Sequence, residues 1–291
     1  MHCGNHCRWL IGTACLASVP LLMAAQATPP PVPPAPPAGY TLVWADEFDV
    51  DGAPDAKNWT FENGFVRNEE VQWYQPQNAR VEKGLLVIEG RRERKVNPVY
   101  EPGATEWRRS REFAEYTSAS LMTRELHTWQ YGHFEMRGRI DTRAGLWPAW
   151  WTLGASGRWP HSGEIDMMEY YRGTLLANVA WGGAAGARPI WDIIRKPLES
   201  LGGPEWSGNF HVWRMLWDER LIRLSVDDVW MNDVDVSQTV NQDGSGVNPL
   251  RQPHYMLVNL AIGGTSGGDP SATAFPSRLE VDYIRVYQKA R

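Results

Sequence analysis

Residues 211–234 read HVWRMLWDERLIRLSVDDVWMNDV, and this stretch decides the fold class. Three runs rich in Val, Leu, Ile and Trp, at 211–217, 221–226 and 229–234, are separated by short polar turns. Alternating runs of this length, joined by turns of a few residues, predict a meander of antiparallel strands.

Similar runs occur before and after this meander. A strand is expected at 85–88, after a Lys83-Gly84 turn, and residues 131–140 alternate apolar or small residues with charged ones. The last strands are expected at 255–262 and 279–287. Because no stretch sustains a long, capped helical period, we predict an all-β fold, an antiparallel sandwich or barrel.

The N-terminus has the pattern of an export signal. Arg8 precedes a long uncharged apolar run, which is typical of a secretory signal peptide over residues 1–27. A small-x-small site places cleavage after Ala27, and a retained anchor is the alternative. Residues 28–39 are mostly Pro, Ala and Val, so they predict an extended linker before a folded domain at 40–291.

The amino-acid composition limits where the protein is expected to work and which molecules it is expected to bind. All three cysteines lie within 1–27, so the predicted mature chain has none for a disulfide, a metal or a nucleophile. A formal net charge of −5 gives no reason to expect a nucleic-acid partner. We expect a secreted, periplasmic or extracellular monomer without a membrane span in its mature form. Its 16 Trp and 10 Tyr are rigid, amphipathic rings that suit ligand binding.

Three acids stand close together in the segment 163–169, which reads GEIDMME. Side chains two apart on a strand share a face, so Glu164 and Asp166 point together. Glu169 would face the other way unless a β-bulge at Met167-Met168 inserts one extra residue. Three acids on one face repel one another and raise at least one pKa, as a general acid at neutral pH requires.

This arrangement suits the hydrolysis of a glycosidic bond. In a retaining enzyme one carboxylate attacks the sugar and a second carboxylic acid protonates the leaving oxygen. The alternative is a solvated polar strand face, which antiparallel sheets commonly have. Spacing alone does not decide between the two.

The segment Glu164–Glu169 resembles the Glu-x-Asp-x-x-Glu signature of glycoside hydrolase family 16, the laminarinase-like group. Further blocks that resemble the family, in family order, are 44–48, 68–74, 116–119, 145–151, 257–264 and 281–287. The resemblance covers residues 42–288. It implies a β-jelly-roll sandwich with a concave substrate cleft and a retaining mechanism. It also implies that Glu164 is the nucleophile, Glu169 the acid/base and Asp166 the residue that orients and tunes the nucleophile.

Tryptophans are the expected sugar-binding side chains. If the segment 146–153 is extended, Trp147 and Trp151 share one face. Their rings could stack on pyranoses, as the matching tryptophans of the family do, although any single Trp is as often a core residue. The resemblance adds four further candidate cleft residues, which are Trp159, Asn68, Arg137 and Trp181.

Three further features bear on substrate and cofactors. The sequence departs from the family at Ala180, where laminarinase-like members often carry His, which puts the leaving-group subsite in doubt. The basic stretch 91–111 is either a solvated loop or a rim that contacts an anionic polysaccharide. No cofactor is expected for catalysis, but Glu47 and Asp282 resemble the acids that hold a structural Ca²⁺ in some family members.

Together these features predict an endo-acting, retaining β-glycan hydrolase with a polysaccharide substrate. The first expectation is β-1,3-glucan or mixed-linkage β-1,3-1,4-glucan. The alternative substrate is a galactan such as agarose or carrageenan. A non-catalytic glycan-binding module is the alternative of another class, because a fold does not fix a function.

Overall fold

Two antiparallel sheets lie face to face in this protein, and a shared core fills the space between them. The structure is a computed structural model that describes residues 1, 38–186 and 188–290. The predicted signal peptide, its cleavage point after Ala27 and nearly all of the predicted linker lie outside the described residues.

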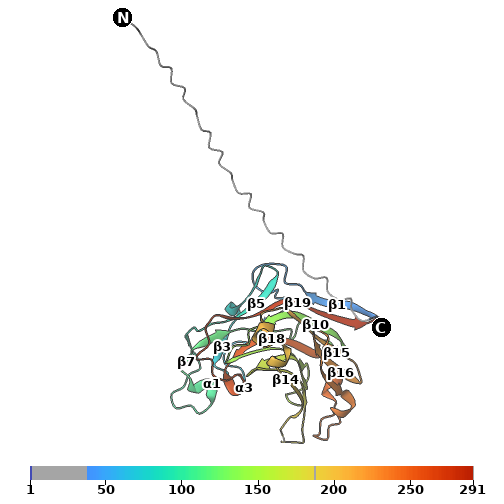
Figure 1. Cartoon of the computed structure of the whole chain (residues 1–291). Helices are drawn as coiled ribbons and strands as arrows, with labels where there is room; N and C mark the ends of the chain where they lie inside the picture. Colours follow the sequence, from blue (N-terminus) through green and yellow to red (C-terminus); the bar gives the residue numbers. More distant parts are fainter. Residues whose placement is uncertain (2–37, 187, 291) are drawn as a thin grey trace. The chain divides into compact units, whose positions relative to one another are not determined.

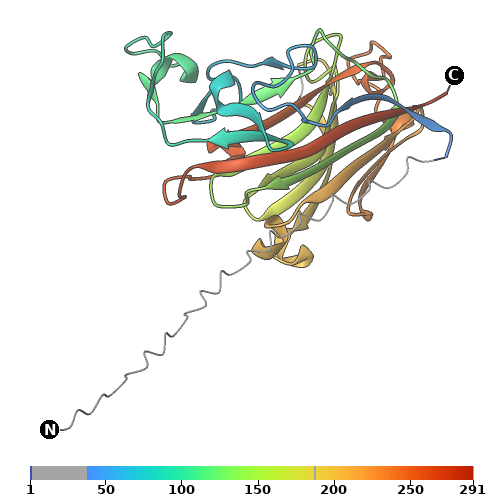
Figure 2. The same cartoon turned by 90° about the horizontal axis from the view of Figure 1, so that it is seen from above.

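The first sheet, called the β10 sheet here, has the strand order β17-β16-β15-β10-β19-β5-β4, and β1 also pairs with β19. Figure 2 shows the long strand β19, in red, running across the whole domain. The strands of this sheet are β1 (Tyr40–Asp46), β4 (Ala79–Glu82), β5 (Leu85–Gly90), β10 (Gly132–Ile140), β15 (His211–Trp217), β16 (Leu221–Val226), β17 (Val229–Asp235) and β19 (Ser277–Lys289).

The second sheet, called the β12 sheet here, has the order β14-β13-β12-β11-β18-β9-β2. Every neighbouring pair in it is antiparallel. Its strands are β2 (Thr60–Phe61), β9 (Ser120–Met122), β11 (Leu146–Gly154), β12 (Glu164–Tyr171), β13 (Thr174–Trp181), β14 (Ile190–Pro197) and β18 (His254–Ile262).

The remaining elements are short (Figure 1). Two small strand pairs are β3 (Gln72–Tyr74) with β8 (Tyr116–Ser118), which is parallel, and β6 (Lys95–Val96) with β7 (Phe113–Ala114). The helices are α1 (Trp107–Ser110), α2 (Pro204–Ser207) and α3 (Gly264–Gly267), with 3₁₀ turns η1 (Pro76–Asn78), η2 (Leu198–Leu201), η3 (Val236–Gln238) and η4 (Pro249–Arg251). Within the described part of the chain, no helix is long and apolar enough to cross a membrane.

Strand alternation places the core. On β15 the inward residues Trp213, Met215 and Trp217 are buried, while the residues between them are partly exposed. On β11 Trp150 is fully buried and belongs to the same core cluster. Burial of such large side chains removes much apolar surface from water, which is the main stabilising contribution in a sandwich of this kind.

The predicted antiparallel sandwich is confirmed. Strands β15 and β16 begin and end where the sequence pattern puts them, and β17 is one residue longer than the predicted 229–234. Strand β19 extends beyond the predicted 279–287 at both ends, because it pairs with β1 at one end and with β5 at the other. Pairing partners, which the local pattern does not specify, therefore set its length.

Candidate active site

Strand β12 presents its three acids to one face and its apolar residues to the core. Pairing with β13 joins Asp166 to Asn178 and Glu169 to Leu176, so the segment between the two acids contains one residue more than its partner. Pairing with β11 shifts at the same place. Met167 and Met168 are both buried in the core. The bulge predicted at these methionines is confirmed, and it turns Glu169 onto the face of the other acids.

The three acids line one cavity of about 450 Å³. The β12 sheet supplies most of its wall, and the segment before β3, the connection between β11 and β12 and helix α3 supply the rest. The lining residues are Arg67, Asn68, Glu70, Trp147, Ala149, Trp151, Leu153, Trp159, Glu164, Asp166, Glu169, Tyr171, Asn178, Trp191, Ile193, Asn259, Ala261, Thr265 and Ser266.

Two side chains from neighbouring strands hold Glu169. The indole Nε1 of Trp147, on β11, donates to Glu169 Oε1 at 2.8 Å. The amide Nδ2 of Asn178, on β13, donates to Glu169 Oε2 at 2.8 Å and to Asp166 Oδ2 at 3.3 Å. Both oxygens of Glu169 therefore have a fixed donor, which orients the carboxyl group.

Glu164 is held from the connection between β11 and β12. Trp159 Nε1 donates to Glu164 Oε2. The connection folds back tightly, because a Cβ on Gly154 would lie 1.9 Å from the carbonyl oxygen of Ser162. Gly163, directly before Glu164, has φ +79°, which favours glycine. Glycines at both ends of the connection therefore allow it to bring Trp159 over the acid.

Burial raises the pKa of all three acids, and the charges of neighbouring acids add to this effect for Asp166 and Glu169. Burial raises the pKa of Glu164 above its usual range. Burial, and then the neighbouring charges of Glu164 and Glu169, raise the pKa of Asp166 well above its usual range. Burial is also the main cause that raises the pKa of Glu169 to about 7, and the hydrogen bond from Trp147 opposes it. A carboxyl group with a pKa near 7 can both donate and accept a proton at neutral pH.

Trp151 is held by partners other than the acids. Its Nε1 donates to Asn259 Oδ1 at 2.7 Å, and the guanidinium of Arg67 lies 5.0 Å from its ring centroid. Arg67 also forms an ion pair with Glu62. The guanidinium of Arg67 therefore fixes the ring face of Trp151, and the side-chain amide of Asn259 fixes its indole N–H.

Four predicted binding residues are in the cavity wall. Trp147, Trp151, Trp159 and Asn68 all line it, and Trp147 and Trp151 share a face with Ala149 as the strand period requires. Trp147 and Trp151 are each 8% exposed, whereas Trp159 is 48% exposed. Trp159 therefore offers the largest free ring surface of the three. That these rings bind sugar remains a prediction.

Two predicted binding residues lie elsewhere, and both predictions are wrong in placement. Arg137 is on β10 of the other sheet, where it forms an ion pair with Asp282. Trp181 belongs to the core cluster. The reason is the period of β13: Asn178 and Ala180 face the cavity side, so Trp181 must face the core.

Ala180 lies on β13, between β12 and β14. It pairs with Glu164 on one side and with Trp191 of β14 on the other, and it is fully buried. His161 is not among the residues that line the cavity and packs against Gly182. A Cβ on Gly182 would lie 2.3 Å from the His161 ring.

The two acids considered for calcium are each paired with an arginine. Glu47 accepts two hydrogen bonds from Arg285, at 2.6 and 2.7 Å, and Asp282 is paired with Arg137. Within 38–186 and 188–290, no three His, Cys, Asp or Glu side chains are grouped so that they could hold a metal ion. A structural Ca²⁺ held by Glu47 and Asp282 remains a prediction.

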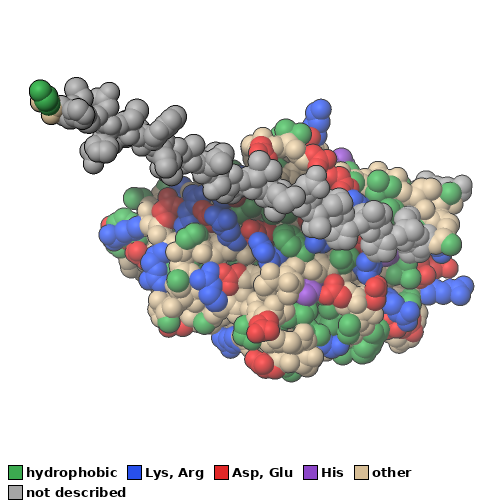
Figure 3. All heavy atoms as spheres, turned by 45° about the horizontal axis from the view of Figure 1, so that its top comes forward, with side chains coloured by type: hydrophobic (Ala, Val, Ile, Leu, Met, Phe, Trp, Pro, Cys, Tyr) green, Lys and Arg blue, Asp and Glu red, His purple; other side chains and the backbone are tan. Residues whose placement is uncertain are grey.

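The basic stretch 91–111 is largely paired within the protein. Arg91, Arg108 and Arg109 form ion pairs with acids on or beside the stretch. Arg111 donates to the backbone oxygens of Glu69 and Glu70, next to the cavity. Figure 3 likewise shows basic side chains interspersed with acidic ones on the face that it presents. Contact with an anionic polysaccharide remains a prediction.

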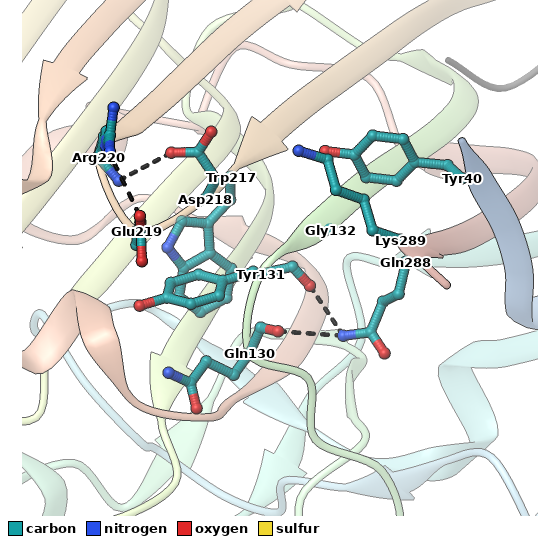
Figure 4. A pocket seen from close by; sticks show the side chains of 10 residues that line it. All are labelled: Tyr40, Gln130, Tyr131, Gly132, Trp217, Asp218, Glu219, Arg220, Gln288 and Lys289. Atoms are coloured by element: carbon teal, nitrogen blue, oxygen red, sulfur yellow. Dashed lines mark hydrogen bonds and ion pairs between the residues drawn. The ribbon is translucent and has the colours of Figure 1, made fainter. Parts of the chain in front are cut away.

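A second cavity, of about 620 Å³, lies at the end of the β10 sheet where β1 begins and β19 ends (Figure 4). Gln288 Nε2 donates to the backbone oxygens of Gln130 and Tyr131 in its wall. Asp218 caps a turn by accepting from the backbone of Arg220 and Leu221. The polar groups of this cavity therefore have structural partners, and the acids of β12 are not among its lining residues.

Among the cavity residues that were not predicted from sequence are Asn178, Arg67, Trp191 and Asn259. Asn178 has a visible signal, since it lies two residues before Ala180 on the same strand face. Arg67, Trp191 and Asn259 come from segments far apart in the sequence and gave no local signal. Pairing between β13 and β14 brings Trp191 to the site, and pairing between β11 and β18 brings Asn259.

Comparisons with known proteins show the family to which the chain is similar. The model of the glycosyl hydrolases family 16 matches residues 70–285. The β-glucanase of Rhodothermus marinus is 35% identical over 264 residues, which are 86% of this chain and 85% of that protein. The glucan endo-1,3-β-glucosidase A1 of Niallia circulans is 30% identical to this chain, which spans 38% of that protein's length.

Solved structures show the same fold. One described with the endo-acting O-glycanases of the human gut microbiota has a TM-score of 0.79 at 33% identity, over 89% of this chain and 94% of that one. The non-specific endo-β-1,3(4)-glucanase SCLam has a TM-score of 0.71 at 35% identity, over 89% and 95%. The predicted jelly-roll sandwich is confirmed. By sequence and fold, this chain is a glycoside hydrolase and belongs to glycosyl hydrolases family 16.

Proposed function

We propose that this chain is a secreted, endo-acting β-glucan hydrolase that works with net retention of anomeric configuration. The observation that carries the proposal is the placement of Glu164, Asp166 and Glu169 on one face of β12, in one cavity, with the pKa of Glu169 at about 7. The relatives named as β-glucanases and endo-1,3-β-glucosidase support β-glucan as the substrate.

The mechanism has two displacements. In the first, a Glu164 oxygen attacks C1, the bond from C1 to the glycosidic oxygen breaks, and that oxygen takes the proton of Glu169. In the second, Glu169 takes a proton from water while the water oxygen attacks C1, which releases Glu164. A pKa near 7 lets Glu169 serve both steps at neutral pH.

Asp166 tunes the nucleophile. Burial and the charges of Glu164 and Glu169 raise the pKa of Asp166 well above its usual range, which favours its protonated form, and its hydrogen bond to Glu164 lowers the pKa of that acid. A neutral neighbour that donates to Glu164 favours the ionised form, which is the form that attacks. Burial raises the pKa of Glu164, and this hydrogen bond opposes that effect.

A second candidate substrate is supported by one comparison. The solved structure with a TM-score of 0.79 is described with O-glycanases that initiate mucin breakdown. Cleavage within a mucin-type O-glycan would use the same two displacements. A galactan such as agarose or carrageenan stays the third candidate, since the acids do not distinguish sugars.

A panel of polysaccharides tests the function. Laminarin, mixed-linkage glucan, agarose, carrageenan and mucin are each incubated with the protein, and new reducing ends are measured. We expect the largest signal on laminarin or mixed-linkage glucan. Activity on mucin or a galactan alone would contradict the β-glucan assignment, and no activity on any of them would favour a non-catalytic binding module.

Azide discriminates the roles of the two glutamates. With an activated aryl β-glycoside of a glucan oligosaccharide, Glu164→Ala should produce a glycosyl azide of inverted configuration, and Glu169→Ala one of retained configuration. Proton NMR identifies the anomers. Net inversion by the wild-type protein would refute the retaining mechanism.

Secretion has its own test. The pattern of residues 1–27 supports export with cleavage after Ala27. Mass spectrometry of protein recovered outside the cytoplasm should find Thr28 as the first residue. A mature protein that starts at Met1 would contradict this part of the proposal.

A further inference from the structure

We propose that the cavity side of β14 forms the subsite for the leaving-group sugar, and that Trp191 is the aromatic platform on which this sugar stacks. The inference rests on the proposed function and names the part of the site that selects what is released. Trp191 lies outside every segment that resembles the family blocks described above.

Strand pairing puts Trp191 in line with the nucleophile. Glu164 on β12 pairs with Ala180 on β13, and Ala180 pairs with Trp191 on β14. In an antiparallel sheet, residues that pair directly point to the same face. Trp191 therefore stands on the face of the acids, one small residue away from Glu164, and it lines the same cavity.

Trp191 is not explained by core packing. Its neighbours on the strand, Ile190 and Asp192, point to the other face, where Ile190 packs against the core and Asp192 accepts from Asn232. Trp191 itself is 37% exposed, against 8% for Trp147 and for Trp151. An exposed indole on the wall of a carbohydrate-processing cavity keeps a flat apolar surface available to a sugar.

Ala180 is the one residue of β13 that stands between Trp191 and Glu164, and it is small. It is fully buried and has only a methyl side chain, so nothing larger stands between Trp191 and Glu164 on β13. A polar side chain there would reach a particular hydroxyl group of the sugar. A flat ring beside a methyl group selects the apolar face of the sugar instead, so this subsite should tolerate differences in hydroxyl configuration.

The two ends of the cavity suit different halves of the substrate. Towards β18 the wall contains polar side chains that are held by the protein, among them Arg67 and Asn259. Such fixed donors suit the sugar that stays bonded to the nucleophile. Towards β14, the last strand of its sheet, the wall is Trp191 and Ile193. A stacking surface at the sheet edge binds the leaving sugar without a network of hydrogen bonds, so no such bonds have to break when the sugar departs.

The test compares two substrates. Laminarin fills the subsites on both sides of the bond that breaks, whereas β-laminaribiosyl fluoride has only a fluoride leaving group. With the fluoride, Glu164 attacks C1, the bond from C1 to fluorine breaks and fluoride departs with the electron pair. Water then releases the sugar. The leaving-group subsite stays empty throughout, so only laminarin reports on it.

We expect Trp191→Ala to lower kcat/KM on laminarin about ten-fold, the factor for a stacked ring worth ~1.4 kcal/mol. On the fluoride its kcat/KM should equal that of the wild type. Trp191→Tyr, which keeps a flat ring, should retain most of the laminarin activity. The control is Trp230→Ala, since Trp230 is 53% exposed on β17 and is not among the cavity residues. It should leave both substrates unaffected.

Each other outcome has a distinct meaning. Unchanged laminarin activity in Trp191→Ala would overturn the inference while the proposed function stands. An equal loss on the fluoride would also overturn it, because Trp191 would then act on the retained sugar or on folding. Failure of the wild-type protein on both substrates would instead refute the proposed function.

Discussion

Replacement of Trp147 by Phe isolates one hydrogen bond of the proposed acid/base. Phe keeps an aromatic ring on the cavity face of β11 but removes the indole N–H that donates to Glu169 Oε1 at 2.8 Å. That N–H stabilises the ionised carboxylate and so lowers the pKa of Glu169 against the effect of burial. Its loss must therefore raise the pKa above about 7.

The size of the shift follows from the kind of hydrogen bond. A hydrogen bond to a charged group contributes about 1.5–3 kcal/mol, and one pKa unit corresponds to about 1.36 kcal/mol. Asn178 still donates to the other oxygen, so we take the lower end and expect a rise of about one unit. More of Glu169 is then protonated at neutral pH.

The pH profile of kcat/KM on laminarin measures this shift. The basic limb reports the loss of the proton from the acid, so it should move up by about one unit in Trp147→Phe. The matched control is Trp151→Phe, because the N–H of Trp151 goes to Asn259 and not to an acid. A basic limb that stays in place in Trp147→Phe, or that moves equally in Trp151→Phe, would refute the reasoning.

Three more changes test other parts of the structure. The charge of Arg195 lowers the pKa of Glu169, so Arg195→Ala should move the basic limb of the same pH profile upward. The shift should be smaller than in Trp147→Phe, and a repeat of the profile in about 1 M salt should make it smaller still. Deletion of Met168 removes the bulge, and regular alternation then keeps Glu169 on the cavity face, but the loss of a fully buried side chain from the core should lower the melting temperature, whereas Met168→Leu should keep it. Arg67→Ala leaves Glu62 without its cation and Trp151 without the guanidinium on its face, so urea unfolding should show a loss of about 3 kcal/mol; a loss below about 1 kcal/mol would contradict this role.

Much of the site was predictable because it lies on single strands. The period of two places Glu164 with Asp166 and Trp147 with Trp151, and the same period requires a bulge before Glu169. The structure contains that bulge and brings all five side chains into one cavity. The same reasoning, carried one strand further, would have excluded Trp181 once Ala180 took the cavity position.

The sequence by itself determined the strands, the shared face of the acids and the need for the bulge, since these depend on local alternation. Only the tertiary structure decided which sheet each strand joins. For this reason Arg137 lies outside the cavity, whereas Trp191 and Arg67 line it. The tertiary structure also decided the pKa of each acid, because burial and the donors from β11 and β13 come from other segments. Local alternation shows which side chains point together, whereas pairing between distant segments decides what they face.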